Sequence, residues 1–340
     1  MSDRTLEAAR DGDETAFREL LEPHRRELHA HCYRMLGSVH DADDALQDAS
    51  LRAWRGLPSF EGRSSLRSWL YTIATNTCLT HIERRPQRTL PVEYGPATDP
   101  HVGPGEPLIE SVWIEPYPDA ALEVEQRESI ELAFIAALQH LPATQRAVLI
   151  LREVLGYTAK ETAATLETTA ASVNSALQRA RATIEDRLPD RTQQQTLKSL
   201  GDDGLRELVD TYVDAWERGD VATVVNLLAE DATFAMPPLA SWFGPREQIK
   251  DFLERYPLSG SWTWRTLTTT ANGQPAVAYY VDGVPFALNV LTLNGDQISD
   301  VVAFVVRELH PDDITRWPEA PVDPARLELT FARFGLPTRR

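Results

Sequence analysis

The first quarter of the chain has apolar residues at helical spacing. Between residues 13 and 36 they recur every three or four positions, and Gly37 ends this run. Residues 41–57 predict a second helix that is acidic at its start and basic at its end, which suits the helix dipole. We expect a third helix over residues 64–85, because this stretch contains neither Pro nor Gly.

The periodicity disappears between residues 86 and 120. This stretch is acidic and dense in Pro and Gly, which predicts a linker. It nevertheless contains Trp113, Ile114 and Tyr117, which a wholly flexible tether would not need. We therefore expect part of the linker to pack on another part of the protein.

Helical spacing returns from residue 121 to residue 190. Residues 122–141 predict one helix and residues 143–157 predict another. A short helix with a small-residue face follows, and Thr169 is suited to cap the helix after it.

That last helix has an apolar and a polar side. Val173 and Leu177 would face the core. The residues outside this stripe are Asn174, Ser175, Gln178, Arg179 and Arg181. This is the geometry of a helix-turn-helix, in which Asn and Gln can read adenine and Arg can read guanine or grip phosphate. A helical packing unit with a polar face is the alternative.

The pattern changes again after residue 200. Residues 205–236 predict two or three helices. Alternating, β-branched and aromatic stretches follow, separated by the turn signals Asn272-Gly273, Asp282-Gly283 and Asn294-Gly295. This order predicts an α+β domain with an antiparallel meander. Residues 311–340 read as a Pro-broken tail with one short amphipathic piece.

Composition limits what the chain can do. Its 340 residues suffice for two or three domains. The net charge is −17 and no segment is a basic module, so we expect weak DNA binding unless a larger partner supplies the positive charge. The sequence has no long apolar run and no signal peptide, which predicts a cytoplasmic protein without membrane contact. Cys32 and Cys78 form no metal-ligand cluster, so neither a metal nor a cofactor is expected.

Candidate chemistry concentrates between residues 59 and 85. Aromatic side chains there can stack on unpaired bases, and the basic ones can follow a phosphate backbone. The residues are Phe60, Arg63, Trp69, Tyr71, Asn76, Arg84 and Arg85. A helix that offers both kinds of group can hold a DNA strand after the duplex has opened. The alternative is an amphipathic core helix with a solvated basic end.

Three segments together resemble the extracytoplasmic-function (ECF) group of sigma-70-type RNA polymerase sigma factors. They are HDADDALQDASLRAW (40–54), FEGRSSLRSWLYTIATNTCLTHIERR (60–85) and the stretch 141–184. The resemblance implies a transcription initiation factor that binds core RNA polymerase, through its β′ clamp helices and β subunit, and promoter DNA. The implied docking residues are Asp43, Asp44, Gln47, Asp48 and Arg52.

The resemblance also implies roles for individual residues in promoter recognition. Phe60 and Asn76 match positions that hold an extruded base of the −10 element, whereas Trp69 and Tyr71 either support that region or belong to the core. The implied −35 contacts are Thr169, Asn174, Ser175, Gln178, Arg179 and Arg181.

Four positions depart from the family pattern. The family often has Lys or Arg at the position of Asn174 and Arg at that of Ala176, and the order of Glu61 and Arg63 is swapped. From the departures at Asn174 and Ala176 we expect either weak binding to the −35 element or a different −35 sequence.

The C-terminal region resembles SnoaL-like, nuclear-transport-factor-2-like domains, from AWERGD (215–220) onwards. The expected fold is thus two all-α sigma domains followed by an α+β cone, most similar to the subgroup containing mycobacterial sigma G. We expect region 2 over 5–86, a linker over 87–120, region 4 over 121–190, the SnoaL-like domain over 200–310 and the tail over 311–340.

In such subgroups the extension contacts the sigma domains and tunes activity, which implies an intramolecular contact through the linker patch Trp113, Ile114 and Tyr117. The alternative is that the cone binds a small ligand or retains isomerase- or cyclase-type catalysis. Catalysis needs a tuned carboxylate or His, and the sequence has no His between Leu205 and Arg307. We therefore expect no enzyme activity and no catalytic residue.

Overall fold

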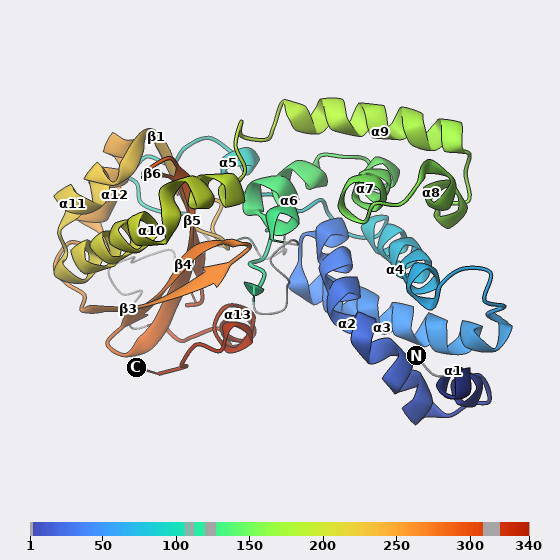
Figure 1. Cartoon of the computed structure of the whole chain (residues 1–340). Helices are drawn as coiled ribbons and strands as arrows, with labels where there is room; N and C mark the ends of the chain where they lie inside the picture. The colour runs from blue at the N-terminus through green and yellow to red at the C-terminus, as the bar shows by residue number, and fades with distance from the viewer. Residues whose placement is uncertain (1–2, 106–107, 109–111, 120–126, 309–319, 340) are drawn as a thin grey trace. The chain divides into compact units, whose positions relative to one another are not determined.

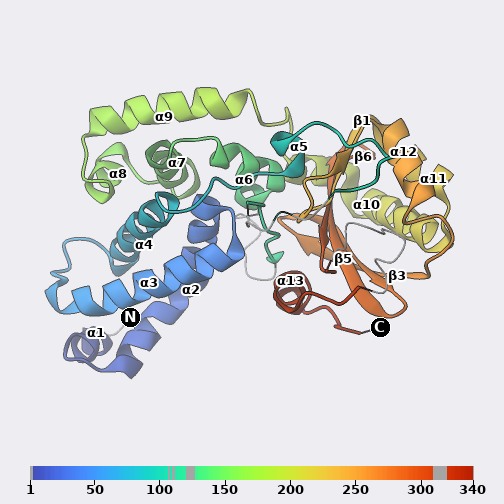
Figure 2. The same cartoon turned by 180° about the vertical axis from the view of Figure 1, so that it is seen from behind.

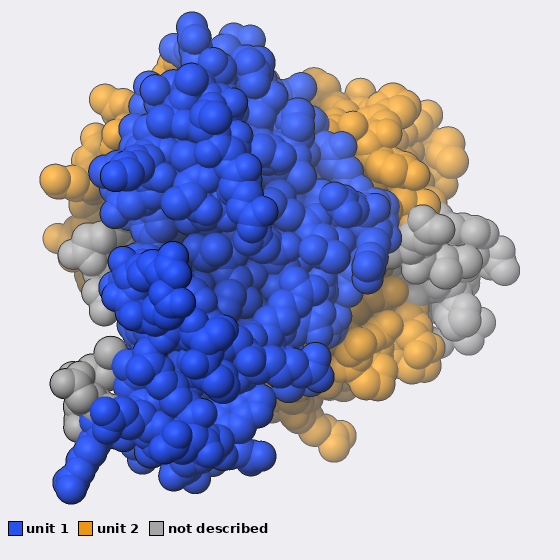
Figure 3. Space-filling model, turned by 90° about the vertical axis from the view of Figure 1, so that its right-hand side faces the viewer, with its two compact units in different colours: residues 1–88, 121–123, 133–188 blue, residues 89–120, 124–132, 189–340 orange. Residues whose placement is uncertain are grey.

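The computed structural model describes residues 3–105, 108, 112–119, 127–308 and 320–339. The chain divides into two compact units, which Figure 3 colours separately. Unit 1 contains residues 1–88, 121–123 and 133–188, and unit 2 contains residues 89–120, 124–132 and 189–340. Among the described residues, no helix combines the length and apolarity needed to cross a membrane.

Unit 1 begins with a cluster of four helices, drawn in blue shades in Figures 1 and 2. They are α1 (Asp3–Arg10), α2 (Glu14–Leu36), α3 (Val39–Gly56) and α4 (Leu66–Ile82). The Asp13 carboxylate caps α2 by accepting hydrogen bonds from the amides of Thr15 and Ala16. Gly37 ends the helix in a left-handed conformation with φ of 70°, which glycine adopts without strain.

The second half of unit 1 contains α6 (Leu132–Gln139), α7 (Ala143–Leu149), a π-helical turn over Ile150–Val154, α8 (Ala159–Thr165) and α9 (Ala170–Glu185). Buried Arg146 ties this half to the first. Its guanidinium donates to the carbonyl of Met35 at 2.5 Å and to Oε1 of Gln139 at 2.6 Å. Burial lowers the pKa of Arg146 to about 10, so the group stays charged at neutral pH.

The predicted single helix over residues 122–141 is wrong. Its beginning lies outside the described residues, and the described part is a 3₁₀ turn over Glu128–Ile130 followed by α6. Glu131 is extended between them, because its carboxylate accepts hydrogen bonds from the amides of Gln193 and Gln194, both at 2.9 Å. Burial raises the pKa of Glu131 to about 7. Tertiary contacts therefore override the local helical pattern.

Unit 2 is built on one six-stranded sheet with the order β2-β1-β6-β5-β4-β3. The strands are β1 (Leu228–Ala235), β2 (Trp242–Phe243), β3 (Trp264–Ala271), β4 (Gln274–Val281), β5 (Val284–Asn294) and β6 (Gln297–Val305). The predicted meander is confirmed, with the three predicted turns joining β3 to β6. The prediction for residues 205–236 is partly wrong, because β1 pairs in parallel with β6 and is not a helix.

Helices cover this sheet (Figure 1). They are α10 (Gln193–Arg218), interrupted at Gly201, with α11 (Val221–Asn226) and α12 (Arg246–Arg255). α10 packs on β3, β4 and β5, while α12 packs on β1 and β2. Part of the predicted tail, residues 311–319, lies outside the described residues. Its short amphipathic piece is α13 (Pro324–Thr330), which packs on β5.

The predicted linker packs on unit 2. The indole N–H of Trp113 donates to the carbonyl of Pro238 at 2.8 Å. In the other direction, the indole N–H of Trp242 donates to the carbonyl of Gly95 at 2.8 Å. The short helix α5 (Pro91–Tyr94) lies in this segment, and the Tyr94 ring makes an edge contact with Trp113. The Pro-rich stretch is therefore largely a structural part of unit 2.

Candidate nucleic-acid interface

α8 and α9 form the predicted helix-turn-helix. Thr169 caps α9 by accepting a hydrogen bond from the amide of Ser172 at 3.1 Å. One side of α9 is buried through Val173, Ala176, Leu177, Ala180 and Ile184. The predicted readout residues Asn174, Ser175, Gln178, Arg179 and Arg181 are all exposed on the other side. α9 thus presents a continuous polar stripe that a major groove can accept.

The structure also explains one departure from the family pattern. Ala176, where relatives often have Arg, is only 7% exposed and belongs to the inner side of α9. Among the exposed polar residues, Arg181 forms an ion pair with Glu153 at 2.6 Å. Both side chains are largely solvent-exposed, so this pair adds little to stability.

The residues predicted to bind the single strand lie on α4, in the loop before it and directly after it. Phe60 is only 8% exposed and lies against Trp69, with ring centroids 4.9 Å apart. The guanidinium of Arg10 lies over the Phe60 ring, 5.8 Å from the ring centre. Arg63 is exposed and pairs with Glu61, and Arg84 is exposed at the end of the helix. The structure therefore brings Phe60 and Trp69 together and leaves the basic residues Arg63 and Arg84 exposed to solvent.

Tyr71 belongs to the core, which was the alternative for this residue. It is 1% exposed, and its hydroxyl donates to the Glu27 carboxylate at 3.2 Å. Arg67 also binds Glu27, with two contacts of 2.8 and 2.7 Å. Although burial acts in the opposite direction, the hydrogen bonds from Arg67 and His24 lower the pKa of Glu27 overall. Tyr71 and Arg67 thus fix α4 onto α2.

α8 covers part of the α4 platform within unit 1. The Thr72 and Thr165 hydroxyl oxygens lie 3.3 Å apart. The side-chain amide of Asn76 donates to the carbonyl of Thr165 at 3.5 Å, a long contact. Tyr157, at the start of the segment leading to α8, makes an edge contact with Tyr71 at 6.2 Å. Asn76 is consequently half-buried and already has a protein partner.

The predicted docking face on α3 is mostly exposed and partly engaged by neighbouring helices. Asp48 lies 3.0 Å from His81 of α4, and Asp44 lies 3.0 Å from Arg85. Arg85 also pairs with buried Asp41, so it is held against α3 and not directed to solvent. The remaining predicted docking residues contact neighbours or solvent: Asp43 lies 3.1 Å from His29, Arg52 donates to Thr77, and Gln47 is exposed.

Comparisons with known proteins agree with this arrangement. Residues 20–88 match the Sigma-70 region 2 family, residues 131–184 match Sigma-70 region 4, and residues 209–308 match the SnoaL-like domain. The chain is 42% identical to ECF RNA polymerase sigma factor SigG of Mycobacterium tuberculosis over 318 residues, which cover 89% of this chain and 84% of SigG. The chain belongs to the ECF sigma factors.

Two further relatives support the same assignment. SigM of Mycobacterium tuberculosis is 35% identical over 184 residues, covering 54% of this chain and 83% of SigM. The crystal structure of the extracytoplasmic-function sigma factor SigJ of Mycobacterium tuberculosis has the same fold, with a TM-score of 0.57 at 19% identity. That likeness covers 94% of this chain and 99% of SigJ. The predicted fold class, helical sigma regions followed by a SnoaL-like α+β domain, is confirmed.

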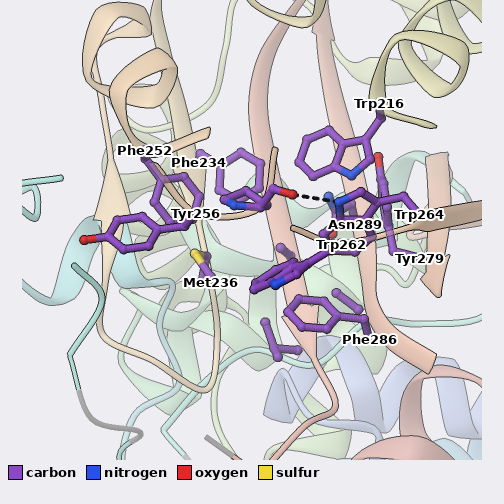
Figure 4. Close-up of a pocket in the computed structure, with 14 residues that line it drawn as sticks. Trp216, Phe234, Met236, Phe252, Tyr256, Trp262, Trp264, Tyr279, Phe286 and Asn289 are labelled. Carbon is purple, nitrogen blue, oxygen red and sulfur yellow. Dashed lines mark hydrogen bonds between the residues drawn. The ribbon is translucent and has the colours of Figure 1, made fainter. Parts of the chain in front are cut away.

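ECF sigma factors are transcription initiation factors that bind core RNA polymerase and promoter DNA. As a family they are not enzymes. None of the described residues lining the cavity of the SnoaL-like domain (Figure 4) is Asp, Glu or His. Asp300 of β6 accepts a hydrogen bond from Thr233 at 2.7 Å and does not line this cavity.

Leu51 was missed by the sequence reasoning, which considered only polar docking residues. Its side chain is 48% exposed, which is unusual for a leucine of a packed helix. It follows Gln47 by four positions and Asp48 by three, so all three share one face of α3. This spacing could have identified it, because an exposed leucine among the predicted docking residues offers apolar contact area.

Proposed function

We propose that this ECF sigma factor directs core RNA polymerase to promoters through two separate surfaces. The polar stripe of α9 reads the −35 element, and the α4 platform holds the opened −10 strand. The exposure of all five readout residues on α9, opposite a fully apolar inner side, is the observation that carries this proposal. The outer face of α3, including Leu51, docks on the β′ clamp helices of the polymerase.

The −10 role requires a conformational change in unit 1. Phe60 and Asn76 would hold a flipped base, whose extraction from the stack costs a few kcal/mol. Asn76 is occupied by the Thr165 carbonyl, and Phe60 is covered by Trp69 and Arg10. We infer that α8 leaves α4 when the protein engages polymerase and promoter. The protein alone would then bind the −10 strand poorly, in keeping with its net charge of −17.

The SnoaL-like domain regulates this change by holding the linker. Three contacts support this role. Trp113 binds Pro238, the amide of Tyr117 donates to Asn272 at 2.8 Å, and Asp119 accepts from the amide of Gly273 at 2.7 Å. The segment before α6 is held similarly, since the amide of Leu132 donates to Gln274 at 2.9 Å. The domain thereby limits how far region 4 can move from region 2.

Run-off transcription with core RNA polymerase and fragments of the organism's own genome tests the initiation role. We expect promoter-specific transcripts that core polymerase alone does not produce. Their absence with both the full chain and a chain ending at residue 188 would contradict the proposal.

The regulatory role is tested by releasing the linker. Trp113→Ala removes a side chain that is 5% exposed, so the linker should detach and promoter activity should change at least severalfold in either direction. Val102→Ala is the matched control, since this linker side chain is 81% exposed. Equal activity and equal affinity for core polymerase in wild type, Trp113→Ala and a chain lacking residues 200–340 would rule out regulation by this domain.

A further inference from the structure

Unit 1 contains a cavity of about 380 Å³ where its first half, α1–α4 with the segment up to residue 88, meets its second half, α6–α9. The first half contributes the end of α2, the start of α3 and side chains between residues 82 and 88, and the second half contributes side chains between residues 139 and 146. α7 packs on both α2 and α4 here (Figure 1). Pockets that bind small molecules measure about 300–1,000 Å³, so this cavity can hold one.

The described residues that line this cavity include three arginines and one aspartate. Arg88 donates to Oδ2 of Asp41 at 2.6 Å, and Arg85 pairs with both Asp41 and Asp44. Asp44 lies outside the lining. The two carboxylates therefore offset two of the three guanidinium charges, and the charge of Arg146 remains.

Arg146 is a buried cation without a carboxylate partner among the described residues. Its guanidinium donates only to uncharged oxygens there, Oε1 of Gln139 and the carbonyls of Gln139, Leu141 and Met35, at 2.6, 3.0, 3.3 and 2.5 Å. Its Nε–H has no hydrogen-bond partner in the described part of the chain. The Cys78 thiol does not compensate the charge, because burial raises its pKa and it keeps its proton. Buried charges are normally paired, so Arg146 calls for an anion from outside the chain.

We propose that this cavity binds the phosphate ester of a small polyol, with the phosphate beside Arg146. A phosphate has three acceptor oxygens in different directions, so it can accept hydrogen bonds from both halves of unit 1, whereas the two oxygens of a carboxylate lie in one plane. The cavity is larger than a phosphate group, and Gln87 and His140 in its wall suit hydroxyl groups. None of the described lining residues is Phe, Tyr or Trp, so the wall has no ring on which a nucleobase would stack.

The cavity is open to solvent, since its lining residues Pro86, Gln87 and Pro142 are exposed. A phosphate between Arg88 of the first half and Arg146 of the second would hold the two halves of unit 1 together. The proposed function requires α8, part of the second half, to leave α4. The bound ester should therefore oppose this movement and reduce promoter opening. This consequence rests on the proposed function, whereas binding itself does not.

Glycerol 3-phosphate is a suitable probe, because it combines a phosphate with two hydroxyl groups. Isothermal titration calorimetry of the full-length protein should show saturable binding of one molecule per chain, and glycerol should not bind. We expect Arg146→Met to weaken binding more than about tenfold, since it removes the uncompensated charge. Gln87→Glu adds a negative charge to the exposed part of the wall and should weaken binding about tenfold. Gln145→Glu, on α7 but outside the lining, is the matched control and should change the affinity less than about twofold.

Several results would overturn the proposal. They are no saturable binding of glycerol 3-phosphate up to about 10 mM, equal binding of glycerol, or equal affinity in wild type and Gln87→Glu. Thermal melting shows whether each variant is folded, and if Arg146→Met is unfolded, Gln87→Glu decides because its side chain is exposed. A thymidine tetranucleotide that displaces glycerol 3-phosphate and binds more tightly would assign the cavity to a DNA strand and also overturn the proposal.

The consequence for transcription has its own test. Saturating glycerol 3-phosphate should lower run-off transcription by wild type and by Gln145→Glu, but much less by Gln87→Glu. Unchanged transcription in wild type would overturn the link to promoter opening. Calorimetry uses no polymerase, so binding can fail while run-off transcription succeeds, and the reverse.

Discussion

We propose that α4 and α9 both contact promoter DNA, yet they differ in how far other parts of unit 1 cover their polar residues. α9 exposes its whole polar stripe, and its described contacts with the rest of unit 1 are made by apolar residues and the exposed pair Arg181–Glu153. α4 is fixed by the half-buried Arg67–Glu27 pair, and its residue Asn76 is occupied by the Thr165 carbonyl. Under the proposed function, α9 can therefore recognise duplex DNA in the free protein, whereas single-strand recognition by α4 requires α8 to move away.

The largest effect should come from a disulfide that locks α8 onto α4. Thr72→Cys with Thr165→Cys replaces hydroxyls that lie 3.3 Å apart, so a disulfide can form with little movement. The oxidised protein should lose transcription more than about a hundredfold, because the open state is no longer populated. Run-off assays with and without dithiothreitol measure this. Cys32 and Cys78 are buried and should not interfere. Full activity of the oxidised double variant would show that α8 need not move.

The second-largest effect, on promoter opening, should come from replacing Asn76. Asn76→Ala should reduce open-complex formation about tenfold, because one base contact is worth about 1–3 kcal/mol. Permanganate footprinting of the −10 region measures strand opening. Thr80→Ala, one turn further along α4, is the matched control and should behave like wild type. If both variants open the promoter normally, Asn76 does not hold a base.

Changes on α9 should have smaller effects that depend on the −35 sequence. Gln178→Ala and Arg179→Ala should each weaken promoter binding about fivefold, since each removes one base or phosphate contact. Both residues are exposed, so the free energy of unfolding should change by less than about 0.5 kcal/mol. Gel-shift titrations of the holoenzyme, with native and scrambled −35 elements, provide the measurement. Equal losses on both DNAs would assign these residues to non-specific binding.

The smallest effects concern stability and distinguish the Arg67–Glu27 pair from the Arg181–Glu153 pair. Glu27→Gln should destabilise unit 1 by about 1 kcal/mol, whereas Glu153→Gln should have almost no effect because its pair with Arg181 is exposed. The pKa of Glu27 is lowered in the folded protein, so its contribution is present above pH 4.5 and is lost as the pH falls below that value. Urea unfolding at pH 7 and pH 4 tests both points. An unchanged pH dependence in Glu27→Gln would contradict this account.

Much of this arrangement could be predicted from local patterns. The apolar spacing of Val173 and Leu177 fixes which side of α9 is exposed, and the turn signals fix the hairpins from β3 to β6. The predictions of secondary structure were wrong where residues distant in the sequence determine the backbone conformation. Residues 228–235 have helix-forming Ala, Leu and Glu, but they pair with β6. Glu131 breaks a helical pattern because it accepts hydrogen bonds from the start of α10.

The candidate sites show the same limit. Sequence reasoning could choose the polar residues of α4 but could not foresee that Thr165, 89 residues away, occupies Asn76. The sequence could predict that Trp113 packs on another part of the protein, because a solvated linker does not need a large aromatic side chain. It could not identify the Pro238 carbonyl as the partner, since that contact spans 125 residues.

The packing of the linker has a practical consequence for building chimaeras. Residues 89–120 and 124–132 belong to the same compact unit as the C-terminal domain, although nearly all of them precede the region 4 match at 131–184. A chimaera that exchanges only the part after residue 189 would remove the hydrogen-bond partners of Trp113, Tyr117 and Glu131. The unit to be exchanged is therefore discontinuous, and its three segments, 89–120, 124–132 and 189–340, must be transplanted together.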